Sequence, residues 1–205
     1  YQRTLVSDAK KVPADRYAMG DKKALNDSQK RGLALYNGKA NCIACHNGPL
    51  ASNQKFYATG VPDHPQFAED PIGQVTHRWE WYQKGVSESD YRNAKGDAGL
   101  YYITMNPKDI GKWRVPSLRE LKYTGPYMHN GMLTTLDDVV EFYNKGGGDA
   151  QNKTKLLKPL KLSAQEKKDL VAFLEALSMD EPLLQDDPKL PGDYQPLPAP
   201  ISAAK

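Results

Sequence analysis

The feature that most constrains this chain is the run Cys42-Ile43-Ala44-Cys45-His46, which contains both of its cysteines. The Cys-x-x-Cys-His spacing is the attachment signature of c-type haem. Two thiols at this spacing can add to the two vinyl groups of one porphyrin, and the adjacent imidazole then lies under the iron. The sequence therefore predicts one covalent haem, attached through Cys42 and Cys45, with His46 as an axial iron ligand.

Other uses of a cysteine pair fit this chain less well. A disulfide framework needs more cysteines, and a structural zinc site needs a second ligand pair. A redox-active Cys-x-x-Cys follows a strand in a βαβ unit, whereas residues 29–40 favour a helix. A helix followed directly by the motif is the order of class I cytochromes c. The predicted fold is mainly α, a class I-like cytochrome c domain with long loops and an extended Pro-rich C-terminal tail.

The 205 residues divide into three predicted parts. Residues 1–26 have no apolar period and are interpreted as an extended N-terminal arm. Residues 27–178 are interpreted as the mono-haem cytochrome c domain, whose first helix is capped by Asp27 or Ser28 and runs to about residue 40. Residues 179–205 form the predicted tail, because their six prolines exclude a helix.

Two later helices are indicated by caps and apolar spacing. One follows Thr134, whose predicted capping partner is Asp137, and the other follows the capping box of Ser163 and Glu166. We expect the last helix to cross the first. Their apolar faces are Leu136, Val139, Val140 and Tyr143 in one and Leu170, Phe173, Leu174 and Leu177 in the other. A small β-ribbon is predicted near residues 100–104, and a short helix over residues 117–122.

Charge narrows the range of partners. The chain has 28 basic and 25 acidic residues, a net charge of +3, which excludes a strongly basic nucleic-acid binder. It has no run of about 20 apolar residues, so no membrane span is predicted. Residues 151–168 hold six lysines, and residues 61–100 hold seven acidic and four basic residues. Opposed charges of this kind can steer docking between redox proteins, although a basic run is usually just a solvated face.

Further motifs resemble one family. Residues 112–119, 124–131 and 136–147, together with the haem motif, are similar to the C-terminal haem domain of the bacterial di-haem cytochrome c peroxidase/MauG family. The resemblance covers about residues 24–178, and residues 61–95 look like a divergent insertion. In this family the N-terminal domain holds the haem where peroxide reacts, and the C-terminal domain holds the haem that passes electrons. Only one haem motif is present in this chain.

The resemblance implies a periplasmic c-type cytochrome that exchanges single electrons with redox partner proteins. The alternative is a haem subunit or fragment of a peroxidase/MauG-like oxidoreductase whose reactive haem is on another chain. A third hypothesis is a peroxidase on its own, with one open iron position. Because the chain begins at Tyr1, we also expect either a removed signal peptide or a processing product.

The second axial ligand is left open. Where the peroxidases have a distal Met, this chain has Tyr143, and in MauG the matching residue is a Tyr that ligates the iron. The alternatives are a core role for Tyr143 and ligation by a methionine, the candidates being Met19, Met105, Met128, Met132 and Met179.

Resemblance also implies roles around the haem. His129 is expected close to it, holding a propionate or its own loop. Arg119 and Lys112 are candidate propionate partners, because a partly buried carboxylate needs a cation or donor; the alternative is an ordinary solvated charge. The Pro49 carbonyl is the expected acceptor for the His46 ring. His64 and His77 are read as surface residues. Calcium, bound in the family through carbonyls matching Thr124 and Pro126, is left open because its completing Asn comes from the other domain.

Overall fold

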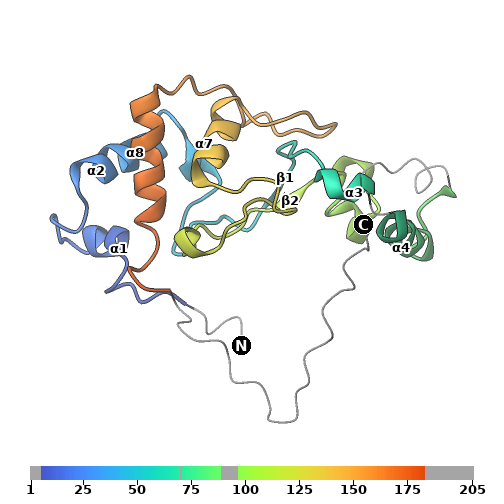
Figure 1. The fold of residues 1–205 in the computed structure, drawn as a ribbon, viewed down its shortest axis with the longest axis horizontal. Helices are drawn as coiled ribbons and strands as arrows, with labels where there is room; N and C mark the ends of the chain where they lie inside the picture. The colour runs from blue at the N-terminus through green and yellow to red at the C-terminus, as the bar shows by residue number, and fades with distance from the viewer. Residues whose placement is uncertain (1–5, 70, 89–96, 183–205) are drawn as a thin grey trace, which may run out of the picture.

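The computed structural model describes residues 6–69, 71–88 and 97–182. In these ranges the chain is mainly helical, as expected, with a single two-stranded antiparallel sheet (Figure 1). The helices and strands are α1 (Pro13–Ala18), α2 (Asp27–Asn37), η2 (Cys42–Ala44), β1 (Phe56–Tyr57), α3 (Pro65–Glu69), α4 (Pro71–Gln83), α6 (Tyr101–Thr104), η3 (Pro107–Asp109), β2 (Trp113–Arg114), η4 (Leu121–Tyr123), α7 (Leu136–Asn144) and α8 (Ala164–Glu175).

The crossing of α2 and α8 organises the main core, and it confirms the predicted contact between the first and last helices. Gly32 lies at the crossing, where a Cβ atom would come within 2.0 Å of the Asp169 carbonyl oxygen. Next to it, the rings of Tyr36 and Phe173 meet edge to face with centroids 5.1 Å apart. Glycine at position 32 therefore lets the two backbones touch.

Capping boxes start all three long helices of this core. Ser163 and Glu166 cap α8 as predicted. The cap of α2 is Asn26 with Gln29, one residue before the nearer of the two predicted caps, Asp27. The cap of α7 is Thr135 with Asp138, one residue after the predicted pair. Each box satisfies backbone N–H groups that a first helical turn leaves free.

The N-terminal region differs from the predicted extended arm. Residues 13–18 form α1, and the side chains of Val12 and Leu25 are almost fully buried. The Ala14 N–H donates to the Ala176 carbonyl at the end of α8 (3.0 Å). Residues 12–25 therefore pack against the α2–α8 core. A few buried apolar side chains hold this short helix in place, although they do not repeat at helical spacing in the sequence.

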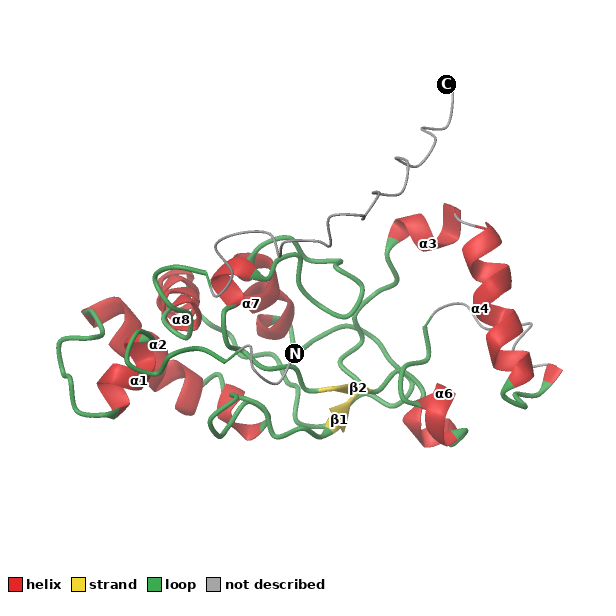
Figure 2. Ribbon diagram, turned by 90° about the horizontal axis from the view of Figure 1, so that it is seen from below, coloured by secondary structure: helices red, strands yellow, loops and turns green. Residues whose placement is uncertain are grey.

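A second aromatic cluster lies at the other end of the molecule, where α3, α4 and α6 are found (Figure 2). Trp81 of α4 contacts the rings of Tyr101 and Tyr102, with centroids 5.9 and 4.4 Å away. This explains why residues 101–104 are helical and the predicted β-ribbon there is wrong. One helical turn can bring both tyrosines onto Trp81, whereas a strand would point them to opposite faces.

The observed ribbon is formed instead by β1 and β2, which pair Tyr57 with Trp113. The predicted short helix over 117–122 is also displaced, to η4. None of the helices in the described ranges is long and apolar enough to cross a membrane. The predicted Pro-rich tail lies outside the described residues, apart from residues 179–182.

Candidate haem-binding site

The haem motif lies immediately after α2. That helix ends at Asn37, and Asn41 takes a left-handed conformation (φ 50°) that turns the chain into η2. The His46 N–H donates to the Cys42 carbonyl (2.9 Å), so the motif forms one compact turn with both thiols free of any disulfide. Burial raises the pKa of Cys42 to about 12. Burial also raises the pKa of Cys45, against a hydrogen bond with Tyr57 that lowers it.

The His46 ring is oriented by its loop. Its Nδ1 lies 3.1 Å from the Ala51 carbonyl oxygen. A carbonyl can only accept, so Nδ1 carries the proton and Nε2 keeps the lone pair that a metal needs. Burial lowers the pKa of His46, and the backbone carbonyls of Ala51 and Pro116 oppose this shift. The expected acceptor, the Pro49 carbonyl, is therefore replaced by Ala51, two residues further along.

Tyr143 comes from α7, whose face also carries the buried residues Leu136 and Val140. Cys42 packs against the same core. Burial, followed by the nearby thiols of Cys42 and Cys45, raises the pKa of Tyr143 to about 12. The phenol therefore lies in the electrostatic neighbourhood of the cysteine pair.

This donor set fits haem c. The cysteine thiols supply the two covalent attachments, His46 supplies a neutral imidazole, and Tyr143 is a further oxygen donor near the cysteines. His46, Cys42 and Cys45 arrive from one turn, and Tyr143 arrives from a helix about 100 residues later.

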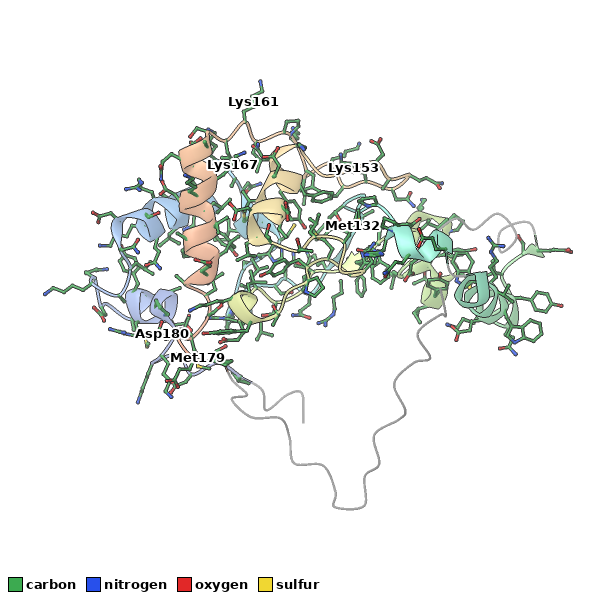
Figure 3. All side chains as sticks on the ribbon, in the orientation of Figure 1. Met132, Lys153, Lys161, Lys167, Met179 and Asp180 are labelled. Atoms are coloured by element: carbon green, nitrogen blue, oxygen red, sulfur yellow. The ribbon has the colours of Figure 1, made fainter. Side chains whose placement is uncertain are left out.

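The methionine candidates are distributed over the fold. Met179 lies beside Asp180 beyond the end of α8, whereas Met132 lies near the β-ribbon (Figure 3). The Met179 N–H donates toward the buried carboxylate of Glu120 (3.3 and 3.4 Å). The choice between Tyr143 and a methionine as second ligand stays a prediction.

His129 and Lys112 lie toward the second cluster. The His129 ring stacks on Trp113, with centroids 4.0 Å apart, and both line a small cavity of about 80 Å³ that also includes Asp63, Asp97 and Asp149. Burial lowers the pKa of His129, and Asp97 and Asp63 oppose this. Lys112 pairs with Asp109 (3.0 Å). The propionate roles proposed for these residues remain predictions.

Arg119 is engaged by protein acceptors. Its guanidinium makes a two-point ion pair with Asp15 of α1 (2.7 and 2.9 Å). It also donates from Nε and Nη2 to the Pro49 carbonyl (2.9 and 2.7 Å). Asp15 was not predicted from the sequence, because it lies 104 positions from Arg119 and meets it only in the folded chain.

The calcium prediction concerns the backbone carbonyls of Thr124 and Pro126. Thr124 is exposed, as is Pro126. Among the residues that the structure describes, no group of three or more His, Cys, Asp or Glu side chains is arranged to hold a metal ion.

The chain is similar in sequence to two kinds of known protein. Over 201 residues the chain is 70% identical to "Cytochrome-c peroxidase IdrP1" of Pseudomonas sp. (strain SCT), a match that covers 98% of this chain and 53% of that protein. It is 35% identical to "Methylamine utilization protein MauG" of Methylorubrum extorquens over 191 residues, which is 93% of this chain and 45% of that protein. The chain is homologous to the di-haem cytochrome c peroxidase and MauG proteins.

Structural comparison supports the same relationship. A crystal structure of a MauG-like protein associated with microbial copper homeostasis matches with a TM-score of 0.64 and 30% identity. That match covers 85% of this chain and 50% of the other. The chain thus spans about half the length of the peroxidase and MauG relatives it matches. No protein-family model matches it.

Proposed function

We propose that this chain is a class I-like cytochrome c unit that binds one haem c covalently and transfers single electrons in the bacterial periplasm. The observation that carries the proposal is the convergence of four groups on one site. They are Cys42 and Cys45 in a compact turn, His46 with Nδ1 bonded to a carbonyl, and the buried phenol of Tyr143, which lies close enough to both thiols for them to raise its pKa.

The ligand arrangement favours electron transfer over chemistry at the iron. Bound haem would supply the one-electron couple, and two side chains holding its iron would leave no position for a substrate. The His46 imidazole would be one of these ligands. Tyr143 is the favoured second ligand.

The covalent attachment gives a direct test. In the double variant Cys42→Ala/Cys45→Ala, we expect complete loss of the haem that survives acid–acetone extraction. The matched control is Ile43→Ala, which changes the same turn but removes no thiol, and it should keep full haem staining on a denaturing gel. Covalent haem in the double variant would contradict the assignment.

A second candidate function is supported by the relatives. A chain that matches half of a cytochrome-c peroxidase at 70% identity can act within a peroxidase or MauG-like oxidoreductase, in which its haem passes electrons to a second, reactive haem. With peroxide and an electron donor, we expect this chain alone to turn over far below the ordinary enzymatic rate of about 10 per second. Turnover near that rate by this chain alone would instead support the third hypothesis, a peroxidase with an open iron position. A native gel stained for haem would reveal a second haem protein that copurifies.

A further inference from the structure

The loop that orients His46 is held by a distant stretch of chain. We call residues 49–52 the His46 loop and residues 115–119 the clamp segment. Ser52 Oγ donates to the Val115 carbonyl (2.7 Å), and Ser117 Oγ donates to the Leu50 carbonyl (2.7 Å). Arg119 donates twice to the Pro49 carbonyl (2.9 and 2.7 Å). Three of the four loop residues are thus tied to the clamp segment.

The fourth loop residue is the one that touches His46. Ala51 is buried and has φ +47°, in the left-handed region. This conformation is unfavourable for a residue with a Cβ atom, and it persists only where the surroundings impose it. The carbonyl of Ala51 then accepts from His46 Nδ1 (3.1 Å). The bonds on either side of Ala51 therefore determine where this acceptor lies.

The clamp segment is itself anchored. The two-point ion pair with Asp15 fixes the guanidinium of Arg119, and both side chains are about four-fifths buried, with exposed fractions of 19% and 22%. Ser117 Oγ accepts from the Arg119 N–H (3.1 Å), which leaves its own proton directed at Leu50. Pro116 also lies close enough to His46 to oppose the lowering of its pKa by burial. The clamp segment thus reaches His46 both directly and through the loop.

We propose that the clamp segment sets the electron donation of His46 to haem iron, with Ser117 and Arg119 as positioning residues. A carbonyl held against Nδ1–H makes the imidazole a stronger donor, which stabilises the ferric state and lowers the reduction potential. Loosening the His46 loop weakens that hydrogen bond and raises the potential. This inference rests on the proposed function, because it requires haem at His46.

The test compares Ser117→Ala and Arg119→Gln with two other variants of the holoprotein. Ser117→Thr keeps the hydroxyl and should restore the wild-type value. Arg31→Gln is the matched control, because the Arg31 side chain pairs with Asp169 of α8 and not with the His46 loop or the clamp segment. In mediator titrations we expect the ferrous-to-ferric ratio at fixed potential to rise about three- to tenfold in Ser117→Ala and Arg119→Gln, tenfold being about 59 mV. The ferric EPR g-values should shift in the same two variants.

The possible outcomes separate the two claims. Absence of covalent haem in the wild type would refute the proposed function. Normal haem attachment, with unchanged potential and EPR signal in Ser117→Ala, would overturn the clamp inference alone. A shift that Ser117→Thr leaves in place, or that Arg31→Gln reproduces, would also overturn the clamp inference. The exposed Ser117 carries the test even where Arg119→Gln fails to fold.

Discussion

At the scale of single residues, the proposed ligand Tyr143 would determine the redox properties of the proposed haem site. Burial and two neighbouring thiols raise its pKa to about 12, so the phenol keeps its proton at neutral pH in the protein alone. A ferric ion is a concentrated positive charge and favours the phenolate. Phenolate ligation would stabilise the ferric state and lower the potential relative to a His/Met cytochrome.

We expect Tyr143→Phe to keep the packing of α7 and to lose the ligand oxygen. The ferric haem should become five-coordinate or water-ligated, and its visible spectrum should change. Its affinity for cyanide should rise at least about tenfold, which corresponds to about 1.4 kcal/mol of binding free energy. Tyr102→Phe, a tyrosine of the second cluster, is the control and should change neither property. An unchanged spectrum in Tyr143→Phe, or a near-infrared sulfur-to-iron band in the wild type, would redirect the search to Met128 or Met132.

The residues of the motif were predictable, whereas the acceptor for His46 was not. Covalent attachment requires two thiols and an imidazole at fixed spacing, so the sequence displays them together. Every residue has a backbone carbonyl, and which one faces Nδ1 depends on the left-handed turn at Ala51 and on bonds from residues more than 60 positions away. The residues next to His46 in the sequence therefore do not indicate which carbonyl will accept its hydrogen bond.

At the scale of helices and strands, Asp169 joins α8 to α2. Its side chain is 3% exposed and accepts from Arg31 (2.7 and 2.8 Å), Ser28 (2.6 Å) and Gln165 (3.0 Å). Arg31 and then Ser28 hold the pKa of this carboxyl well below its usual range. A carboxyl whose pKa is lower in the folded chain stabilises folding above its unfolded pKa of about 3.9, and that stability is lost as the pH falls toward the folded value.

We expect Asp169→Asn to lower the free energy of unfolding by about 1–2 kcal/mol at pH 7, a modest figure because Arg31 is 56% exposed and water weakens the pair. The deficit relative to the wild type should shrink below about pH 4, where the wild-type carboxylate begins to lose its advantage. Urea unfolding of the holoprotein at pH 7, 5 and 3 measures this. Asp137→Asn, an exposed acid in the first turn of α7, serves as control. A deficit that does not change with pH would show that the charge of Asp169 is irrelevant.

The long helices were easier to predict than the short elements, for a physical reason. In α8, the Ser163–Glu166 box and the apolar period act over neighbouring residues, so the local sequence specifies both start and face. The four residues of α6 are helical because Trp81 lies where Tyr101 and Tyr102 can pack on it. The segment after Pro116 is not helical, since Ser117 and Arg119 bind the His46 loop.

At the scale of the whole molecule, charge suggests where a redox partner docks. The connection from α7 to α8 carries the exposed residues Lys155, Lys158 and Lys161, which we call the lysine edge, and Figure 3 shows Lys161 at the upper rim of the molecule with Lys153 and Lys167 below it. This connection is anchored near the site, because the Gly148 N–H donates to the Thr59 carbonyl (3.1 Å) and the Thr154 N–H to the Ala58 carbonyl (3.0 Å). It also begins directly after Tyr143. A fixed basic edge beside the haem site can attract an acidic electron donor.

Variants with reversed charge can show whether the lysine edge attracts an acidic electron donor. In Lys155→Glu/Lys158→Glu/Lys161→Glu, we expect reduction by an acidic plant-type ferredoxin to slow about tenfold or more at low ionic strength, because steering depends on complementary charge. The difference should vanish at about 1 M salt, where the screening length falls to about 3 Å. Lys10→Glu/Lys11→Glu/Lys23→Glu changes the net charge equally on the N-terminal region and should leave the rate close to that of the wild type. Stopped-flow measurements at several salt concentrations separate the two variants. Equal slowing by both would mean that net charge, rather than the lysine edge beside α7, governs the encounter.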